Sequence, residues 1–200
     1  MGVVKAVCVS EVKGVQKHAV KEITLLEDWG VKDDAHAGDW HRQVSLLSAE
    51  SAQAFIDAGA PVTDGSFGEN IVISGFDFKR LPVGTQYRVG DQVILEQTQI
   101  GKHCHDRCAI YHIMGDCIMP REGVFTRVLR GGVVRPGDPV IIDFVPNKFQ
   151  ELEAATEIAQ KWPEAMKAEA EAKRRDEAAL ERKRIQEETK RAAEHANSAE

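Results

Sequence analysis

Gly90-Asp91-Gln92-Val93-Ile94, a turn followed by the start of an apolar strand, recurs as Gly137-Asp138-Pro139-Val140-Ile141. In both copies the Gly-Asp pair favours a tight turn, and the β-branched residues after it favour an extended strand. Further apolar runs predict strands at residues 3–10, 21–26, 44–47, 70–73, 87–89, 93–98 and 140–143. Many short strands separated by glycine-containing turns favour a compact antiparallel barrel over a layered α/β fold. We therefore predict a mainly β chain, a β-barrel with a few short helices.

One short helix is predicted directly after the strand at 44–47. Ser48 is a suitable N-cap, and Ala52, Phe55 and Ile56 share one helical face. Gly59 is expected to end this helix, because glycine favours the position after a helix C-terminus.

The C-terminal part of the chain has a different composition. All 16 glycines precede residue 150, whereas residues 151–200 are rich in Ala, Glu, Lys and Arg. The sequence therefore predicts two parts, a β-barrel domain over residues 1–147 and a charged helical extension over residues 148–200. The spacing of its apolar residues does not sustain a heptad, so we expect a largely solvated helix rather than a coiled coil.

The extension is expected to form a helix in two pieces. Pairs such as Glu157 and Lys161 place opposite charges four residues apart, which stabilises a helix. Pro163 fits a first helical turn, so we expect a break at Trp162. The apolar residues that could anchor the extension on the barrel are Leu152, Ile158, Trp162 and Met166. No site residue is expected in this part of the chain.

Composition and charge exclude several classes of function. The net charge of −6 argues against a general nucleic-acid binder, which would carry a basic stripe. No run approaches the roughly 18 apolar residues of a membrane span. The N-terminus lacks the basic start and apolar middle of a signal peptide, so we expect a cytoplasmic protein that binds neither nucleic acid nor membrane.

Three of the four cysteines lie close together in the sequence. Cys8 sits in an apolar strand and is expected to be a core residue, whereas Cys104, Cys108 and Cys117 fall within fourteen residues. A cytoplasmic protein of this size does not need disulfides, so these thiols are candidates for chemistry. One interpretation is a closed zinc site built from Cys104, Cys108 and Cys117 with a histidine, although the C-x3-C-x8-C spacing matches no common zinc module. Burial of Cys108 and Cys117 as small core residues is the other simple interpretation.

The second chemical interpretation is a reactive thiolate at Cys104. Four basic or histidine side chains lie within three positions of it: Lys102, His103, His105 and Arg107. Positive charge lowers a thiol pKa and favours the thiolate. A thiolate there could attack an electrophile, carry a persulfide sulfur or ligate a soft metal.

Two further polar segments lie upstream. Residues 33–44 place acids, two histidines and an arginine before a strand, among them His36 and Arg42. Residues 65–70 combine two glycines with Glu69 and Asn70 at a strand start. Loops at strand ends are where binding and catalytic residues concentrate, so both segments are candidate walls of a site.

These segments together resemble the MOSC domain, named after the C-terminal region of molybdenum-cofactor sulfurase. The resemblance covers about residues 1–145. Within the family, the sequence resembles the small stand-alone members of bacteria and archaea. Its residues run in the family's order: Gly-x-x-Asp-Asp-Ala-His-Ala-Gly, His-Arg-Gln-Val-Ser-Leu-Leu, Gly-Ser-Phe-Gly-Glu-Asn-Ile, Thr-Gln-x-x-x-x-Cys and Gly-Val-Phe-Thr-Arg-Val-Leu. Here Ile100-Gly101-Lys102-His103-Cys104 stands where commoner small members have Pro-Arg-x-Pro-Cys.

The resemblance implies a MOSC-type barrel with a pocket near one end, holding a molybdopterin-type cofactor of molybdenum or tungsten. Cys104 matches the family cysteine, as persulfide carrier or molybdenum ligand. The pocket positions match Arg42, Asn70 and Arg127, while His36 and Glu69 lie in matching motifs. The catalytic candidates are therefore Cys104, His36, Lys102, His103 and His105, the cofactor-binding candidates Arg42, Glu69, Asn70 and Arg127, and the further metal candidates Cys108 and Cys117.

The function expected from this resemblance is sulfur handling for metal–sulfur cofactor maturation. Its implied partners are the molybdenum or tungsten cofactor or its enzyme, and a cysteine desulfurase as sulfur donor. The C-terminal helix is a candidate surface for a protein partner. Two alternatives stay open: a molybdenum-cofactor-dependent reductase of N-hydroxylated compounds, and a non-enzymatic zinc module.

Overall fold

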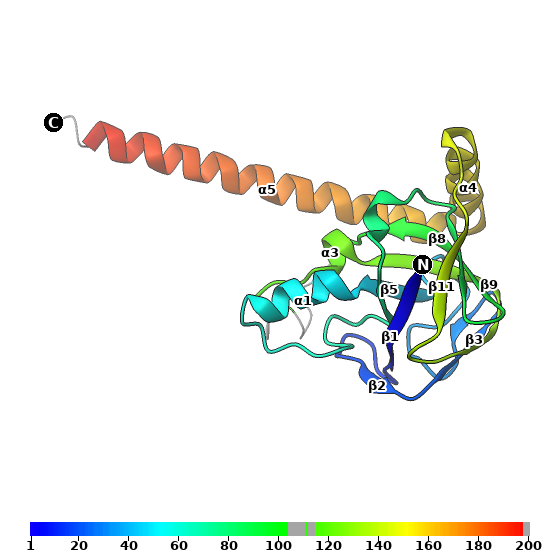
Figure 1. The fold of residues 1–200 in the computed structure, drawn as a ribbon. Coiled ribbons are helices and arrows are strands. Elements are labelled where there is room, and N and C mark those ends of the chain that lie inside the picture. Colours follow the sequence, from blue (N-terminus) through cyan, green and yellow to red (C-terminus); the bar gives the residue numbers. More distant parts are fainter. Residues whose placement is uncertain (104–110, 112–114, 198–200) are drawn as a thin grey trace.

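A computed structural model describes residues 1–103, 111 and 115–197 and side chains as far as residue 188, and it confirms the mainly β fold (Figure 1). In these residues seven strands close into a barrel, in the order β11-β7-β8-β9-β5-β6-β1, and β11 pairs back onto β1. The barrel strands are β1 (Gly2–Val9), β5 (Val44–Ser48), β6 (Ile71–Ser74), β7 (Gln86–Val89), β8 (Val93–Ile100), β9 (Val124–Arg130) and β11 (Pro139–Phe144).

The other elements lie around this barrel. β2 extends the sheet beside β1, and β10, β3 and β4 form a small second sheet. These strands are β2 (His18–Val20), β3 (Ile23–Leu26), β4 (Gly30–Val31) and β10 (Gly132–Val134). The helices are α1 (Ala49–Asp57), the 3-10 turn η1 (Phe78–Arg80), α3 (Met119–Glu122), α4 (Lys148–Lys161) and α5 (Pro163–Asn197).

The repeated Gly-Asp turns occupy neighbouring places in the barrel. Gly90 and Gly137 both have positive φ, at 60° and 95°, a conformation that glycine adopts without a steric penalty. The backbone N–H of Gly90 donates to Pro139 of the second copy at 2.9 Å. The turns start β8 and lead into β11, so each copy delivers a valine, Val93 or Val140, into the barrel interior.

The barrel interior is filled by aliphatic side chains from every barrel strand. Because strand residues alternate between the two faces of a sheet, each strand sends its inward residues to one common core. Buried examples, one per strand, are Val4, Leu46, Ile71, Val89, Leu95, Val128 and Val140.

The sequence predicted an antiparallel barrel, but one pair of neighbouring barrel strands is parallel. β5 and β6 pair in parallel, with Leu46 opposite Ile71. Parallel neighbours need a crossover connection, and α1 lies in the segment that joins these two strands. Ser48 caps α1 by accepting the backbone N–H of Ser51, which confirms the predicted helix start. Ala52 and Phe55 pack on a second apolar cluster, whereas Ile56 on the predicted face is exposed.

The central strand β9 was missing from the sequence-based strand assignment. Its Val124 and Val128 are fully buried, and it pairs with β5 on one side and β8 on the other. Arg127 and Arg130 interrupt its apolar character, although the five consecutive residues 124–128 are all buried.

The C-terminal extension forms two helices that meet at Trp162, as predicted. Trp162 ends α4, and Pro163 begins α5, which runs out past the barrel (Figure 1). Ile158 and Trp162 are buried, but Leu152 is exposed, so the expectation that Leu152 anchors the extension is wrong. In the described part of the chain, no helix is both long and apolar enough to span a membrane.

Candidate functional site

The first part of the site is a buried carboxylate, Asp34, on which five donor contacts converge. Its Oδ2 lies 2.5 Å from Lys17 Nζ, 3.0 Å from the backbone N–H of Ser10 and 3.1 Å from Asn70 Nδ2. Its Oδ1 accepts the backbone N–H of His36 at 2.9 Å and lies 3.1 Å from His36 Nδ1. The side chains of Lys17 and Asp34 are each only 1% exposed, so this ion pair is shielded from water.

Burial and pairing act in opposite directions on these groups. Burial alone would raise the pKa of Asp34, but hydrogen bonds from His36 and Lys17 and the charge of Lys17 outweigh it, so the pKa lies well below its usual range. Burial lowers the pKa of Lys17 despite the neighbouring carboxylate. Lys17 Nζ also lies 3.3 Å from His36 Nδ1. Both contacts of the His36 ring use Nδ1, so any proton exchange with a ligand falls to Nε2.

The second part of the site surrounds Arg42. Its guanidinium lies over the ring of Trp40, 4.8 Å from the centroid, and 5.5 Å from that of Phe125. Arg42 Nη1 donates to Glu169 Oε2 at 3.0 Å, a contact between the barrel and α5. The indole N–H of Trp40 donates to the backbone carbonyl of His36 at 2.9 Å. Trp40 therefore connects the Asp34 network to Arg42.

Gln99 and His103 complete the contacts to the Glu169 carboxylate. Gln99 Nε2 donates to Glu169 Oε1 at 2.9 Å, and the backbone N–H of His103 donates to the same oxygen at 2.8 Å. His103 Nδ1 lies 3.0 Å from Asp176 Oδ2, a second contact to α5. We call the three donors, Arg42 Nη1, Gln99 Nε2 and His103 N–H, the oxyanion site.

His41 is a buried residue that contacts Gln99 of the oxyanion site. It is 1% exposed, and its Nε2 lies 2.7 Å from Gln99 Oε1. Burial lowers its pKa, so the ring is neutral near pH 7. Within the described residues, His41 Nδ1 and the buried Gln43 Nε2 have no hydrogen-bond partner. Unpaired buried polar atoms of this kind are uncommon inside proteins.

A cavity of about 310 Å3, which we call the helix-barrel pocket, lies beside the oxyanion site. Two predicted catalytic residues, Lys102 and His103, line it together with Gln99 from the barrel. From α5 it takes Met166, Glu169 and Lys173. Cys104, His105, Arg107 and Cys108 follow this wall in sequence but lie outside the described residues.

None of the four predicted cofactor-binding residues lines this pocket: Arg42 contacts Glu169 at its edge, and the other three lie elsewhere. The carboxylate of Glu69 accepts the backbone N–H groups of Gly65 and Phe67 at 2.7 and 3.0 Å, and burial raises its pKa to about 7. Asn70 bridges Asp34 and neighbouring backbone groups. Arg127 pairs with Glu96 at 2.8 Å and Glu157 at 2.9 Å. In the described structure all three therefore make internal contacts that organise the barrel.

The two described cysteines are buried. Burial raises the pKa of Cys8 to about 12, which makes it a poor nucleophile and confirms its place in the core. Cys117 packs in the apolar cluster beside α1. Among the residues whose placement is described, no three His, Cys, Asp or Glu side chains are arranged to hold a metal. The proposed zinc ligands Cys104 and Cys108 are outside that set.

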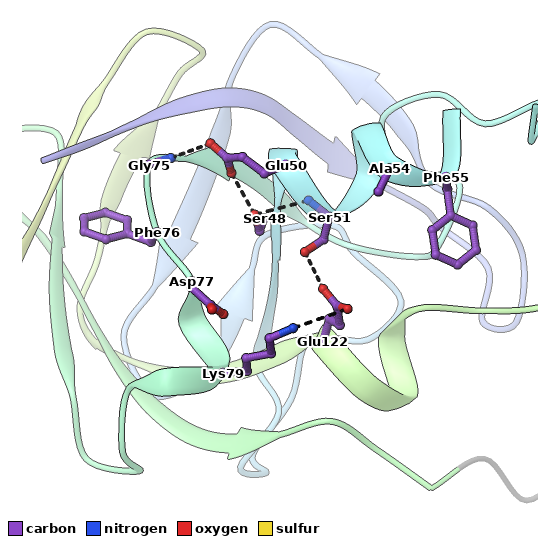
Figure 2. Close-up of a pocket in the computed structure, with 10 residues that line it drawn as sticks. All are labelled: Ser48, Glu50, Ser51, Ala54, Phe55, Gly75, Phe76, Asp77, Lys79 and Glu122. Atoms are coloured by element: carbon purple, nitrogen blue, oxygen red, sulfur yellow. Dashed lines mark hydrogen bonds and ion pairs between the residues drawn. The ribbon is translucent and has the colours of Figure 1, made fainter. Parts of the chain in front are cut away.

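A second cavity, of about 560 Å3, lies on another side of the barrel between α1 and η1 (Figure 2). Figure 2 shows that both of its glutamates contact neighbouring side chains or backbone groups. Glu50 accepts the Gly75 N–H and the Ser48 hydroxyl, and Glu122 contacts Ser51 and Lys79. The carboxylates of Glu50, Asp77 and Glu122 line this cavity, so it is less suited to an anionic ligand than the oxyanion site is.

Sequence reasoning missed Lys17, Gln99 and Glu169 as members of the site. Gln99 stood in a quoted motif, five residues before Cys104, and this was the available signal. Lys17 lies in a polar loop, and Glu169 resembles every other glutamate of the charged extension. Their roles arise from tertiary contacts.

The family model of the MOSC domain matches residues 33–141. The YUAD protein from Bacillus subtilis has a similar structure, with a TM-score of 0.57 and 17% identity over 70% of this chain and 94% of that one. YiiM from Geobacillus stearothermophilus gives 0.56 and 20% over 80% and 83%, and YiiM from Escherichia coli 0.53 and 17% over 77% and 76%. At these identities the similar structures show a shared fold. No curated protein matches the sequence at a significant level.

Proposed function

The chain belongs to the MOSC domain family, which is associated with the molybdenum cofactor, and on that basis we propose that it binds a molybdopterin-type cofactor and carries sulfur on Cys104. The sulfur is held as a persulfide and serves the maturation of a metal–sulfur centre. A cysteine desulfurase is the proposed sulfur donor, and the molybdenum or tungsten cofactor, or its enzyme, is the proposed acceptor.

One observation carries this proposal, namely that two of the three donors of the oxyanion site, Gln99 and His103, lie directly before Cys104 in the chain. Arg42, Gln99 and the His103 N–H hold a carboxylate at 2.8–3.0 Å. Guanidinium and backbone N–H groups hold phosphate oxygens by the same charge-assisted hydrogen bonds. The residues therefore fit the phosphate of a pterin cofactor, which would supply the metal that receives sulfur.

Positive charge supports the thiolate that this chemistry needs. Lys102 and His103 border the helix-barrel pocket and precede Cys104 immediately. In the proposed step the Cys104 thiolate attacks the terminal sulfur of a desulfurase persulfide. A new S–S bond forms on Cys104, the donor S–S bond breaks, and the donor cysteine leaves as a thiolate, so no external oxidant is needed.

His36 is the proposed proton carrier of the site. Asp34 and Lys17 hold its Nδ1 edge, and its side chain is 31% exposed. A histidine oriented by a carboxylate in this way can give or take a proton at Nε2.

Intact-mass measurement of the full chain tests the proposal. After incubation with a cysteine desulfurase and cysteine, we expect one added sulfur atom, about 32 Da, that thiol reductant removes. Cys104→Ser should abolish the adduct, while Cys8→Ala and Cys117→Ala should keep it. An adduct that persists in Cys104→Ser would show that Cys104 is not the carrier.

A reductase acting on N-hydroxylated compounds is a second candidate, favoured by the size of the helix-barrel pocket. Its volume of about 310 Å3 falls at the small end of the range for ligand pockets. Turnover of an N-hydroxylated base by the cofactor-loaded protein with a chemical reductant would support this activity. Persulfide formation without turnover would support the carrier.

A further inference from the structure

The Glu169 carboxylate occupies the oxyanion site with both of its oxygens. Oε2 takes the Arg42 guanidinium, while Oε1 takes the Gln99 amide and the His103 backbone N–H. All three donors belong to the barrel domain, and the carboxylate comes from α5, 127 residues away from Arg42 in sequence. The side chain of Glu169 is only 13% exposed, so it fills the position in which another anion would bind.

The donors are positioned by the barrel rather than by α5. The rings of Trp40 and Phe125 flank the Arg42 guanidinium. The Gln99 carbonyl oxygen contacts His41 Nε2 at 2.7 Å, which directs the amide N–H2 away from His41. Barrel residues therefore hold two of the three donors, Arg42 and Gln99, in place for an anion whether or not α5 supplies it.

The contact of α5 with the barrel is limited in extent. Ala172 is buried, but the second polar contact joins His103 and Asp176, whose side chains are 35% and 51% exposed. Such exposed ion pairs contribute little to stability. The helix is separated from α4 at Trp162, where the chain leaves helical geometry, so α5 can change its angle without unfolding α4.

We propose that Glu169 is an internal competitor, and that a phosphate-bearing ligand displaces it from the oxyanion site and releases α5. A phosphate group carries more negative charge than a carboxylate and has three acceptor oxygens, so it can use the same three donors. The ligand's identity as a cofactor rests on the proposed function, whereas the competition itself does not. The position of α5 then depends on whether a ligand fills the oxyanion site, because Glu169 and a bound anion cannot occupy that site together.

Pyrophosphate titration of the full chain by calorimetry tests the competition. Glu169→Gln removes the competing charge, so we expect pyrophosphate to bind about 5- to 150-fold more tightly than to the wild type, the usual range of such coupling. Glu171→Gln removes the same charge from an exposed position two residues away, and should leave the affinity unchanged. Equal affinity for wild type and Glu169→Gln overturns the competition, and absence of binding to Glu169→Gln overturns the oxyanion site.

Hydrogen exchange measures the release of α5 in the same samples. In the wild type, pyrophosphate should speed amide exchange in residues 166–176, with no change in β8. Unchanged exchange at saturating pyrophosphate overturns the release. The persulfide experiment on Cys104 is independent of this one, so a failed sulfur carrier leaves the competition result standing, and a failed competition leaves the sulfur result standing.

Discussion

Replacing Asp34 by Asn is expected to be among the most damaging single changes in the barrel. The substitution keeps the shape of the side chain but leaves the Lys17 ammonium, 1% exposed, without its anion. Removing one partner of a buried ion pair costs about 3–5 kcal/mol of folding free energy. Lys17→Met should cost less, because four donor contacts from Ser10, His36 and Asn70 still reach the carboxylate.

Urea unfolding at pH 7, followed by circular dichroism, measures both costs and their coupling. Since each single variant strands a charge, Lys17→Met with Asp34→Asn should lose about 1–3 kcal/mol less than the sum of the two. Asp33→Asn is the matched control: the residue is exposed at φ 65°, which Asn tolerates, so we expect a change under about 0.5 kcal/mol. Additive costs, or a loss under about 1 kcal/mol for Asp34→Asn, would refute the buried pair.

The pH dependence gives the same interaction a second signature. The folded pKa of Asp34 lies below the ordinary aspartate value of 3.8, so the unfolded state binds the proton more tightly. Its stabilisation is therefore complete above the unfolded pKa and is lost as the pH falls from about 5 toward the lower folded pKa. Asp34→Asn should flatten the acid limb of the stability curve in that window, and an unchanged acid limb would contradict the assignment.

Three other predictions concern Glu69 and Gly65 in the loop before β6, and the neighbouring Cys8 of β1. Glu69→Gln can accept only one of the two backbone N–H groups that Glu69 holds, so it should cost about 1–3 kcal/mol in urea unfolding. Its raised pKa of about 7 means that the wild type should gain stability as pH falls from 7 toward 4.5, and Glu69→Gln should not. Gly65→Ala should cost at least about 2 kcal/mol, because φ is 89° and the new Cβ would lie 2.4 Å from the Lys17 carbonyl oxygen. Cys8 should resist iodoacetamide in the folded protein, and mass mapping that finds it labelled without unfolding would contradict its burial.

The barrel could be predicted from sequence because its signals are local. A Gly-Asp turn and the β-branched residues that follow it are read within five positions, and both copies of this pattern serve the same purpose in the fold. Strand β9 was not predicted, because a charged residue such as Arg127 is typical of the protein surface. Its charge is instead neutralised by Glu96 on the next strand and Glu157 on α4, contacts that no local pattern contains. The parallel pairing of β5 and β6 was missed for the same reason, since a helix between two strands permits either direction.

The residues of the candidate site likewise fall into two groups, those that the local sequence indicates and those that only tertiary contacts bring to the site. Lys102 and His103 were predicted because they adjoin Cys104 in sequence, and both line the helix-barrel pocket. Lys17 was missed because lysine is rarely buried, and only the five-donor arrangement at Asp34 makes its burial tolerable. A loop lysine carries no sign of that arrangement in its own neighbourhood.

The charged extension is the clearest case of a composition that hides a specific contact. Met166, Glu169, Ala172 and Asp176 recur at intervals of three or four residues, so they share one helical face. Both acidic members of that face contact basic or donor groups of the barrel, Glu169 at Arg42 and Asp176 at His103. A helix selected only for solubility has no need to match its charges to a site at these spacings. The match therefore favours α5 as a part of the site's chemistry, with Glu169 as the residue through which it acts.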